Sequence, residues 1–158
     1  MQIEIEFRGK RVDTGEWVYG YYAERFNNDH IIYVNEIHNG DNFLAAYPVI
    51  PKTVGQYTGL KDKTGKAIYE GDIIRFNNNE DDLCQVCFGE FPVYDIETEE
   101  VTDTAHGWYA KVVFTDGLSR LEPFCYDRIL NNQWIGTLEI EVIGNICEHT
   151  ELLLEVSE

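Results

Sequence analysis

The chain has 158 residues, of which 29 are acidic and 12 are basic, so its formal net charge is −17. A field of this sign repels phosphate backbones, which proteins bind through Lys and Arg, and we therefore expect no direct nucleic-acid binding. Membrane-spanning helices need about 18 or more apolar residues in succession, and the sequence holds no such stretch.

The first residues, MQIEIEF, alternate charged and apolar side chains and lack the basic and apolar regions of a secretory signal. We therefore expect a cytoplasmic protein. In that compartment the four cysteines would be reduced thiols rather than disulfides.

The acidic residues are unevenly distributed. Residues 76–110 contain nine acidic and no basic side chains, and residues 129–158 contain six acidic and no basic ones. Side by side, these two segments would resemble the charge of a nucleic-acid duplex, which suggests a DNA mimic that inhibits a basic host protein. The alternative is that the acidity only maintains solubility.

Alternation of polar and apolar residues, followed by aromatic and β-branched runs, predicts strands in the first third of the chain. Residues 2–8 would form a half-buried strand with Ile3, Ile5 and Phe7 on one face. Further strands, separated by turn sequences that include Asn39-Gly40, are predicted at residues 17–22, 31–34 and 43–49. Pro48 indicates the end or the edge of a sheet.

Glycines divide the central segment, residues 54–76, into short extended pieces, because glycine tolerates the backbone angles of tight turns. A turn is predicted at residues 62–65 and a second corner at residues 70–72, with a strand at 73–76. Further strands are predicted at residues 83–88, 108–114, 118–121 and 138–146.

Three less regular segments lie in the second half of the chain. The acidic run from Asp95 to Asp103 predicts a long solvated loop, and residues 125–133 fit either an irregular segment or a helical turn. Thr150 would begin a short terminal helix that contains Leu152 and Leu153.

Three blocks together resemble the YopX family of phage and prophage proteins. They are VGQYTGLKDKTGK followed by IYEGDII in the centre, FRGKRVDTGEWVYGYY near the start, and VIGNICEHTELL near the end. The resemblance implies a mainly β protein of a bacterial host cell. The family has no assigned biochemical function, so no catalytic residues carry over, and residues 77–110 match nothing in its pattern.

We predict a mainly β protein of two small antiparallel β subdomains. The first covers residues 1–55, and the second covers residues 56–158 as an SH3-like barrel with a short C-terminal helix. A single mixed barrel without an internal boundary is the alternative.

Cys84 and Cys87, with Cys125 and Cys147, could supply four thiolates for tetrahedral zinc. However, Gln85-Val86 favours an extended strand, which would direct Cys84 and Cys87 to opposite faces. We therefore predict inert thiols and no metal or other cofactor. The acidic runs also lack the ordered ligands of an EF-hand-type calcium loop.

The four histidines lie far apart and match no metalloprotease or serine-hydrolase motif. We predict no catalytic residues, which favours a non-enzymatic role. The enzyme alternative is a hydrolase or transferase whose site gathers His106, Asp116 and a cysteine such as Cys87.

Aromatic side chains concentrate in the matched blocks, and a strand face rich in Trp and Tyr is typical of protein interfaces. Packing in the core is the alternative for them. The sequence thus predicts an accessory module that binds a protein partner and leaves homo-oligomerisation open. The predicted partner-binding residues are Trp17, Tyr19, Tyr21, Tyr57 and Tyr69.

Overall fold

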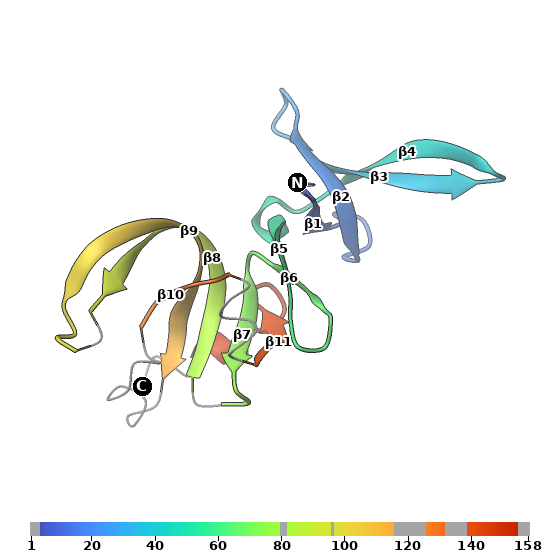
Figure 1. The fold of residues 1–158 in the computed structure, drawn as a ribbon. Helices are drawn as coiled ribbons and strands as arrows, with labels where there is room; N and C mark the ends of the chain where they lie inside the picture. The colour runs from blue at the N-terminus through green and yellow to red at the C-terminus, as the bar shows by residue number, and fades with distance from the viewer. Residues whose placement is uncertain (1–3, 80–81, 96, 116–125, 132–138, 155–158) are drawn as a thin grey trace. The chain divides into compact units, whose positions relative to one another are not determined.

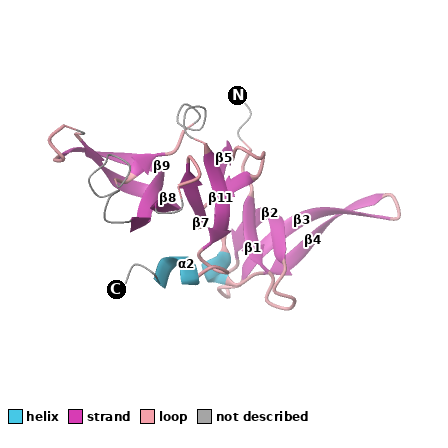
Figure 2. Cartoon of the chain, turned by 90° about the horizontal axis from the view of Figure 1, so that it is seen from below, coloured by secondary structure: helices cyan, strands magenta, loops and turns pink. Residues whose placement is uncertain are grey.

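The computed structural model describes the whole chain except residues 1–3, 80–81, 96, 116–125, 132–138 and 155–158 (Figure 1). Its contacts divide the chain into two compact units, residues 1–59 and residues 60–158. The fold is mainly β, as predicted. Helical residues in the described part are confined to the short pieces η1 and α2 (Figure 2).

The first unit is an antiparallel sheet in the order β4-β3-β2-β1-β5. Strand β5 runs across the boundary between the units and also pairs with β6. The elements are β1 (Phe7–Lys10), β2 (Trp17–Glu24), β3 (His30–His38), β4 (Asp41–Pro48), η1 (Pro51–Thr53) and β5 (Gly55–Lys61). Ile31, Ile32, Val49 and Tyr57 are its buried apolar side chains.

The first strand differs from its prediction. Alternation indicated a strand over residues 2–8, but β1 begins at Phe7, where it pairs with Gly20 and Gln56 on its two sides. Ile5 is 56% exposed rather than half-buried. The reason is that a strand needs backbone partners, and alternation alone does not supply them.

The hairpin of β3 and β4 is confirmed at the predicted turn. Asn39 and Gly40 have φ of 52° and 84°, as a two-residue turn with two positive φ angles requires. The two strands pair without a register shift from Ile31 with Pro48 to His38 with Asp41. Pro48 ends β4, which is the edge strand of this sheet.

The second unit contains an antiparallel sheet in the order β10-β9-β8-β7-β11. Its elements are β6 (Ala67–Tyr69), β7 (Asp72–Phe76), β8 (Asp82–Tyr94), β9 (Val101–Thr115), β10 (Arg128–Ile129), β11 (Ile140–Asn145) and α2 (Glu151–Leu154). Its core consists of Leu60, Ile68, Ile74, Phe76, Cys84, Val86, Ala110, Leu130, Ile140 and Val142.

The predicted SH3-like barrel is not what the described strands form, because this sheet is open. Strands β8 and β9 have 13 and 15 residues, whereas β7 has 5. Their far ends therefore pair only with each other and form a two-stranded ribbon beyond the rest of the sheet (Figure 1). Sequence alternation marked the proximal part of each strand and missed this extension.

The same extension corrects the predicted acidic loop. Strand β8 continues to Tyr94 and β9 begins at Val101, so Asp103 lies in a strand. Only residues 95–100 form the connection, in which Asp95 Oδ1 accepts hydrogen bonds from the amides of Glu97 and Thr98. The strand predicted at residues 118–121 lies outside the described residues.

Strand β11 ends where the sequence predicted. The Asn145 side chain accepts hydrogen bonds at 3.0 Å from the amides of both Cys147 and Glu148, which turns the chain out of the strand. The single helical turn α2 follows after Thr150. Residues 125–133, whose structure the sequence left open, contain the short strand β10.

Candidate functional site

The five predicted partner-binding residues differ in exposure. In the first unit Tyr19 and Tyr21 are 44% and 59% exposed, and Trp17 is half-buried. Tyr57 and Tyr69 are 7% and 4% exposed and belong to the cores, which favours the core-packing alternative for these two residues. Burial also raises the pKa of the Tyr57 hydroxyl, with a smaller effect from Glu4 and Glu6.

Strand register adds a residue that the sequence analysis missed. Tyr21 pairs directly with Tyr33 in β3, and paired residues of antiparallel strands point to the same face. Tyr19, two residues before Tyr21 in β2, shares this face. We call Tyr19, Tyr21 and Tyr33 the tyrosine face. The β-branched run at residues 31–34 predicted a strand that contains Tyr33, but only the pairing of β2 with β3 shows which neighbours Tyr33 has.

A hollow of about 280 Å³ adjoins the tyrosine face. The chain segment before β1 contributes Glu4, Ile5 and Glu6 to its lining, and the rest comes from β2 and β3: Tyr19, Gly20, Tyr21, Tyr33, Val34 and Asn35. Two acidic side chains and three tyrosines thus line one depression. Such a site suits hydrogen-bond donors and cations on a partner.

Two basic side chains border the tyrosine face along β1. The guanidinium carbon of Arg8 lies 4.7 Å from the Trp17 ring centroid, and Lys10 Nζ lies 5.5 Å from it. Arg25 donates a hydrogen bond of 3.0 Å to the Tyr33 hydroxyl. These contacts hold the half-buried Trp17 and the Tyr33 ring in place before any partner binds.

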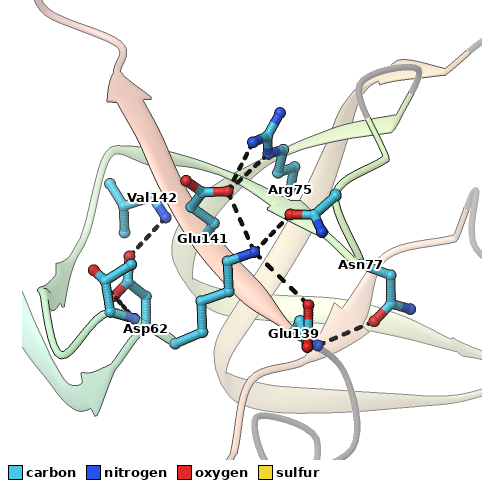
Figure 3. A network of polar contacts seen from close by, with 9 residues as sticks. Asp62, Arg75, Asn77, Glu139, Glu141 and Val142 are labelled. Carbon is cyan, nitrogen blue, oxygen red and sulfur yellow. Dashed lines mark hydrogen bonds and ion pairs between the residues drawn. The ribbon is translucent and has the colours of Figure 1, made fainter.

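The central glycine-rich segment has a structural role in the second unit (Figure 3). Asp62 is 6% exposed, and its carboxylate accepts hydrogen bonds from the Thr64 hydroxyl and from the amides of Thr64 and Lys66, which fixes the turn. Its second oxygen accepts a hydrogen bond from the amide of Val142, 80 residues away in β11.

This turn covers the outer edge of β11. Besides the bond from Val142 to Asp62, the amide of Lys63 donates to the carbonyl of Ile140 at 2.9 Å. Strand β11 is the last strand of its sheet, and an uncovered edge would be free to pair with other chains. The LKDKTGK sequence therefore closes a sheet edge through Asp62 and Lys63.

Ion pairs extend the same network along β11. Glu141 accepts hydrogen bonds from Arg75 Nε and Nη2 at 3.0 and 2.8 Å, and Lys63 Nζ lies 3.6 Å from the same carboxylate oxygen. Lys63 Nζ also lies 3.7 Å from Glu139. The bond from Arg75 lowers the pKa of Glu141 most, and the charges of Arg75 and Lys63 add to it.

These pairs bear on the predicted DNA mimic. That hypothesis needs the acidic residues of 76–110 and 129–158 on one surface. Glu139 and Glu141, from the second segment, instead pair with Lys63 and Arg75 at the β11 edge. The tip of the β8–β9 ribbon carries the exposed acidic residues Asp95, Glu97, Glu99 and Glu100. Strands β8 and β11 lie on opposite sides of β7 in the sheet.

The strand interpretation of Cys84 to Cys87 is confirmed. Both lie in β8, with Cys84 buried in the core beside Val86 and Cys87 half-buried on the other face, opposite Tyr109 in β9. Burial raises the pKa of the Cys87 thiol, which reduces its thiolate fraction. Cys147 is half-buried, and Cys125 lies outside the described residues.

We predict that protein purified without added metal contains well under one zinc ion per chain. In the part of the chain that the structure describes, no three potential ligands gather around a common point. Elemental analysis after mild chelation checks this. Near-stoichiometric zinc would contradict it and would require Cys84 and Cys87 to turn toward one another.

The residues of the enzyme alternative are not brought together. His106 shares a face with Phe88 and Trp108, and its ring contacts Phe88 at a centroid distance of 5.1 Å. Cys87 pairs with Tyr109, three positions after His106, so Cys87 and His106 point to opposite faces of the hairpin. Asp116, the third predicted member, lies outside the described residues.

Comparison with known proteins agrees with the resemblance seen in the sequence. The family model described as YopX protein matches residues 6–154, nearly the whole chain. No curated protein matches the chain. Among the described residues, no helix is both long and apolar enough to cross a membrane. The match over residues 6–154 shows that the chain belongs to the YopX family.

Proposed function

We propose that this protein is a non-catalytic accessory protein of a phage or prophage that binds a protein partner through its tyrosine face in the cytoplasm of the bacterial host. The observation that carries the proposal is the exposure of Tyr19 and Tyr21 beside a hollow of about 280 Å³. Tyrosine side chains supply large contact areas at small entropic cost, and buried tyrosines dominate the binding energy of many interfaces.

The surroundings of the tyrosine face support a specific interface rather than a chance exposure. Tyr33 is held by Arg25, and Trp17 is covered by Arg8, so rigid aromatic rings lie next to charged groups. An apolar centre bordered by polar side chains is the usual anatomy of a protein interface. Glu4 and Glu6 favour a partner segment that carries a Lys or Arg side chain into the hollow.

A second candidate function is binding of a basic protein at the acidic tip of the β8–β9 ribbon. Four exposed acidic residues lie within residues 95–100, next to the exposed apolar Val93 and Val101. This is the part of the DNA-mimic hypothesis that the described residues support. The enzyme alternative has less support, because Cys87 and His106 point to opposite faces.

Affinity capture with matched variants tests the proposal. The immobilised full chain is compared with the double variant Tyr19→Thr/Tyr21→Thr, because threonine keeps a high strand propensity while it removes the ring. Phe26→Thr is the control, since Phe26 is a fully exposed aromatic residue of the same unit outside the tyrosine face. We expect the double variant to capture at least about tenfold less of a specific partner from host lysate than the unmodified chain does. The control should capture as much as the unmodified chain.

Salt separates the two candidate functions. Salt should only weaken the binding of tyrosine-face partners, because it screens their contacts with Glu4 and Glu6 but not the ring contacts, whereas partners of the acidic tip should elute completely. The proposal fails if both variants capture the same proteins as the unmodified chain, or if the captured proteins are all released by salt and indifferent to Tyr19 and Tyr21.

A further inference from the structure

Strand β4 presents an unpaired sheet edge. It is the last strand of its sheet, and in the described part of the chain no hydrogen bond reaches the outward backbone groups of residues 41–47. Its far half, with the facing half of β3, is exposed on both faces and extends as a ribbon (Figure 1). Leu44 and Ile37, on one face of the ribbon, are 56% and 72% exposed.

The backbone orientation of this edge follows from its ends. The carbonyl of Pro48 points outward and accepts a hydrogen bond from the amide of Val12, whereas the amide of Val49 points inward to His30. Because the pairing with β3 has no register shift, every second residue before Pro48 also points outward. Asn42, Leu44 and Ala46 therefore offer their N–H and C=O groups to a neighbouring strand.

Two other edges among the described strands carry protection that the middle of β4 lacks. The Asp62–Lys63 turn covers β11, and the β8–β9 ribbon carries Pro92 together with acidic side chains such as Glu90. Residues 42–47 contain no charge, no proline and no bulge. Proline, charge and bulges are the devices that keep edge strands from pairing, so their absence between Asp41 and Pro48, the two end residues of β4, indicates a pairing surface there.

We propose that the β4 edges of two copies of this chain pair antiparallel about a two-fold axis at Leu44, so that the β3–β4 ribbons of both copies form one continuous sheet. A second copy fits because the outward groups are symmetric about Leu44. Leu44 pairs with Leu44 of the other copy, Asn42 with Ala46 and Ala46 with Asn42, and each outward N–H and C=O then has a partner.

Side chains and charge agree with this register. The two Leu44 side chains cover each other on one face, and on the other face Phe43 lies opposite the small Ala45 of the second copy. A register shifted toward Pro48 would place a residue without an N–H group in the ladder. The edge itself is uncharged, and residues 1–59 hold eight acidic and five basic side chains, so most of the net −17 lies outside this unit.

Sedimentation velocity of the full chain over a wide concentration range measures the dimer. We expect a monomer–dimer equilibrium that high salt strengthens, because salt screens the repulsion between two strongly acidic chains. Leu44→Pro removes an outward N–H that the monomer does not use, and should weaken the dimer at least about tenfold. Leu44→Thr, which keeps the N–H group, should weaken it less.

Charge substitutions test the register without touching the backbone. In the proposed dimer Asn42 lies opposite Ala46, so Asn42→Lys/Ala46→Lys and Asn42→Glu/Ala46→Glu both place like charges together and should dissociate it. Asn42→Lys/Ala46→Glu places opposite charges together and should restore it. Since the two like-charge variants change the net charge in opposite directions, net charge cannot explain a loss in both.

The outcomes are distinct. A chain that stays monomeric at every concentration and salt, or a dimer that tolerates Leu44→Pro and both like-charge variants, overturns the proposal. An edge that binds only an extended peptide of another protein would also leave the chain monomeric and overturn it. Circular dichroism of each variant shows that the monomer remains folded, and the charge variants keep the test valid if Leu44→Pro does not fold.

Discussion

Replacement of Asp62 by alanine is expected to lower the free energy of unfolding of the second unit by about 3–4 kcal/mol. The carboxylate is buried and accepts four hydrogen bonds, three of them from backbone amides. Bonds to a charged acceptor contribute about 1.5–3 kcal/mol each, and their loss leaves the amide of Val142 buried without its acceptor. Urea unfolding followed by circular dichroism measures the change.

Asp13→Ala is the matched control. Asp13 lies in an exposed turn of the first unit and pairs with Arg11 at 2.7 Å, and exposed pairs contribute little to stability. We expect no measurable change in its unfolding midpoint. A similar midpoint for Asp62→Ala and the unmodified chain would show that the Asp62–Val142 bond does not hold the turn against β11.

Acid should remove the contribution of Asp62 to the free energy of unfolding. Burial alone would raise the pKa of this carboxyl group, but the hydrogen bonds from Thr64, Val142 and Lys66 outweigh it and hold the pKa below its ordinary value. Because the folded-state pKa is lowered, this stability is fully present above the unfolded-state pKa of about 3.9 and is lost as pH falls through the folded-state value. The stability difference between the unmodified chain and Asp62→Asn should therefore shrink in that acidic range.

Gly20→Ala is expected to destabilise the first unit by at least about 3 kcal/mol. A Cβ atom at Gly20 would lie 2.1 Å from the backbone carbonyl oxygen of Tyr33. No side-chain rotation relieves a contact with backbone, so β2 would have to move away from β3. The same movement would deform the hollow beside Tyr19 and Tyr21, and the variant should also lose partner binding.

A second glycine separates this clash from ordinary backbone strain. Gly15 has a φ of +73°, and a Cβ atom there would meet nothing within 4 Å. Gly15→Ala should cost only about 1 kcal/mol, from the left-handed conformation alone. Thermal unfolding measures the loss of stability in each variant. Equal losses of stability would mean that β2 and β3 separate easily at Gly20.

The tyrosine face and the β4 edge both belong to the first unit, yet they use different atoms. In these proposals the tyrosine face would bind through side chains of β2 and β3, and the β4 edge would pair through backbone groups of Asn42, Leu44 and Ala46. Variants at Tyr19 and Tyr21 should therefore leave self-association unchanged, and Leu44→Pro should leave partner capture unchanged unless the partner requires a dimer.

The sequence by itself determined the fold class, most strand positions and several turns of this protein. Asn39-Gly40 and the Gly65 turn are local features, because the positive φ angles that those turns need are encoded by two or three adjacent residues. The opposite faces of Cys84 and Cys87 followed from strand geometry alone. The family blocks could also be identified from the sequence, since each is a continuous stretch of chain.

Only the tertiary structure decided which aromatic residues are exposed. Tyr21 and Tyr57 both lie in strands, but Tyr21 is exposed whereas Tyr57 is buried. The bond from Val142 to Asp62 joins residues 80 positions apart, and the open edge of β4 depends on which strand lies last in the sheet. Burial and edge position arise from pairing between distant segments, and the local pattern of a strand does not specify its neighbours.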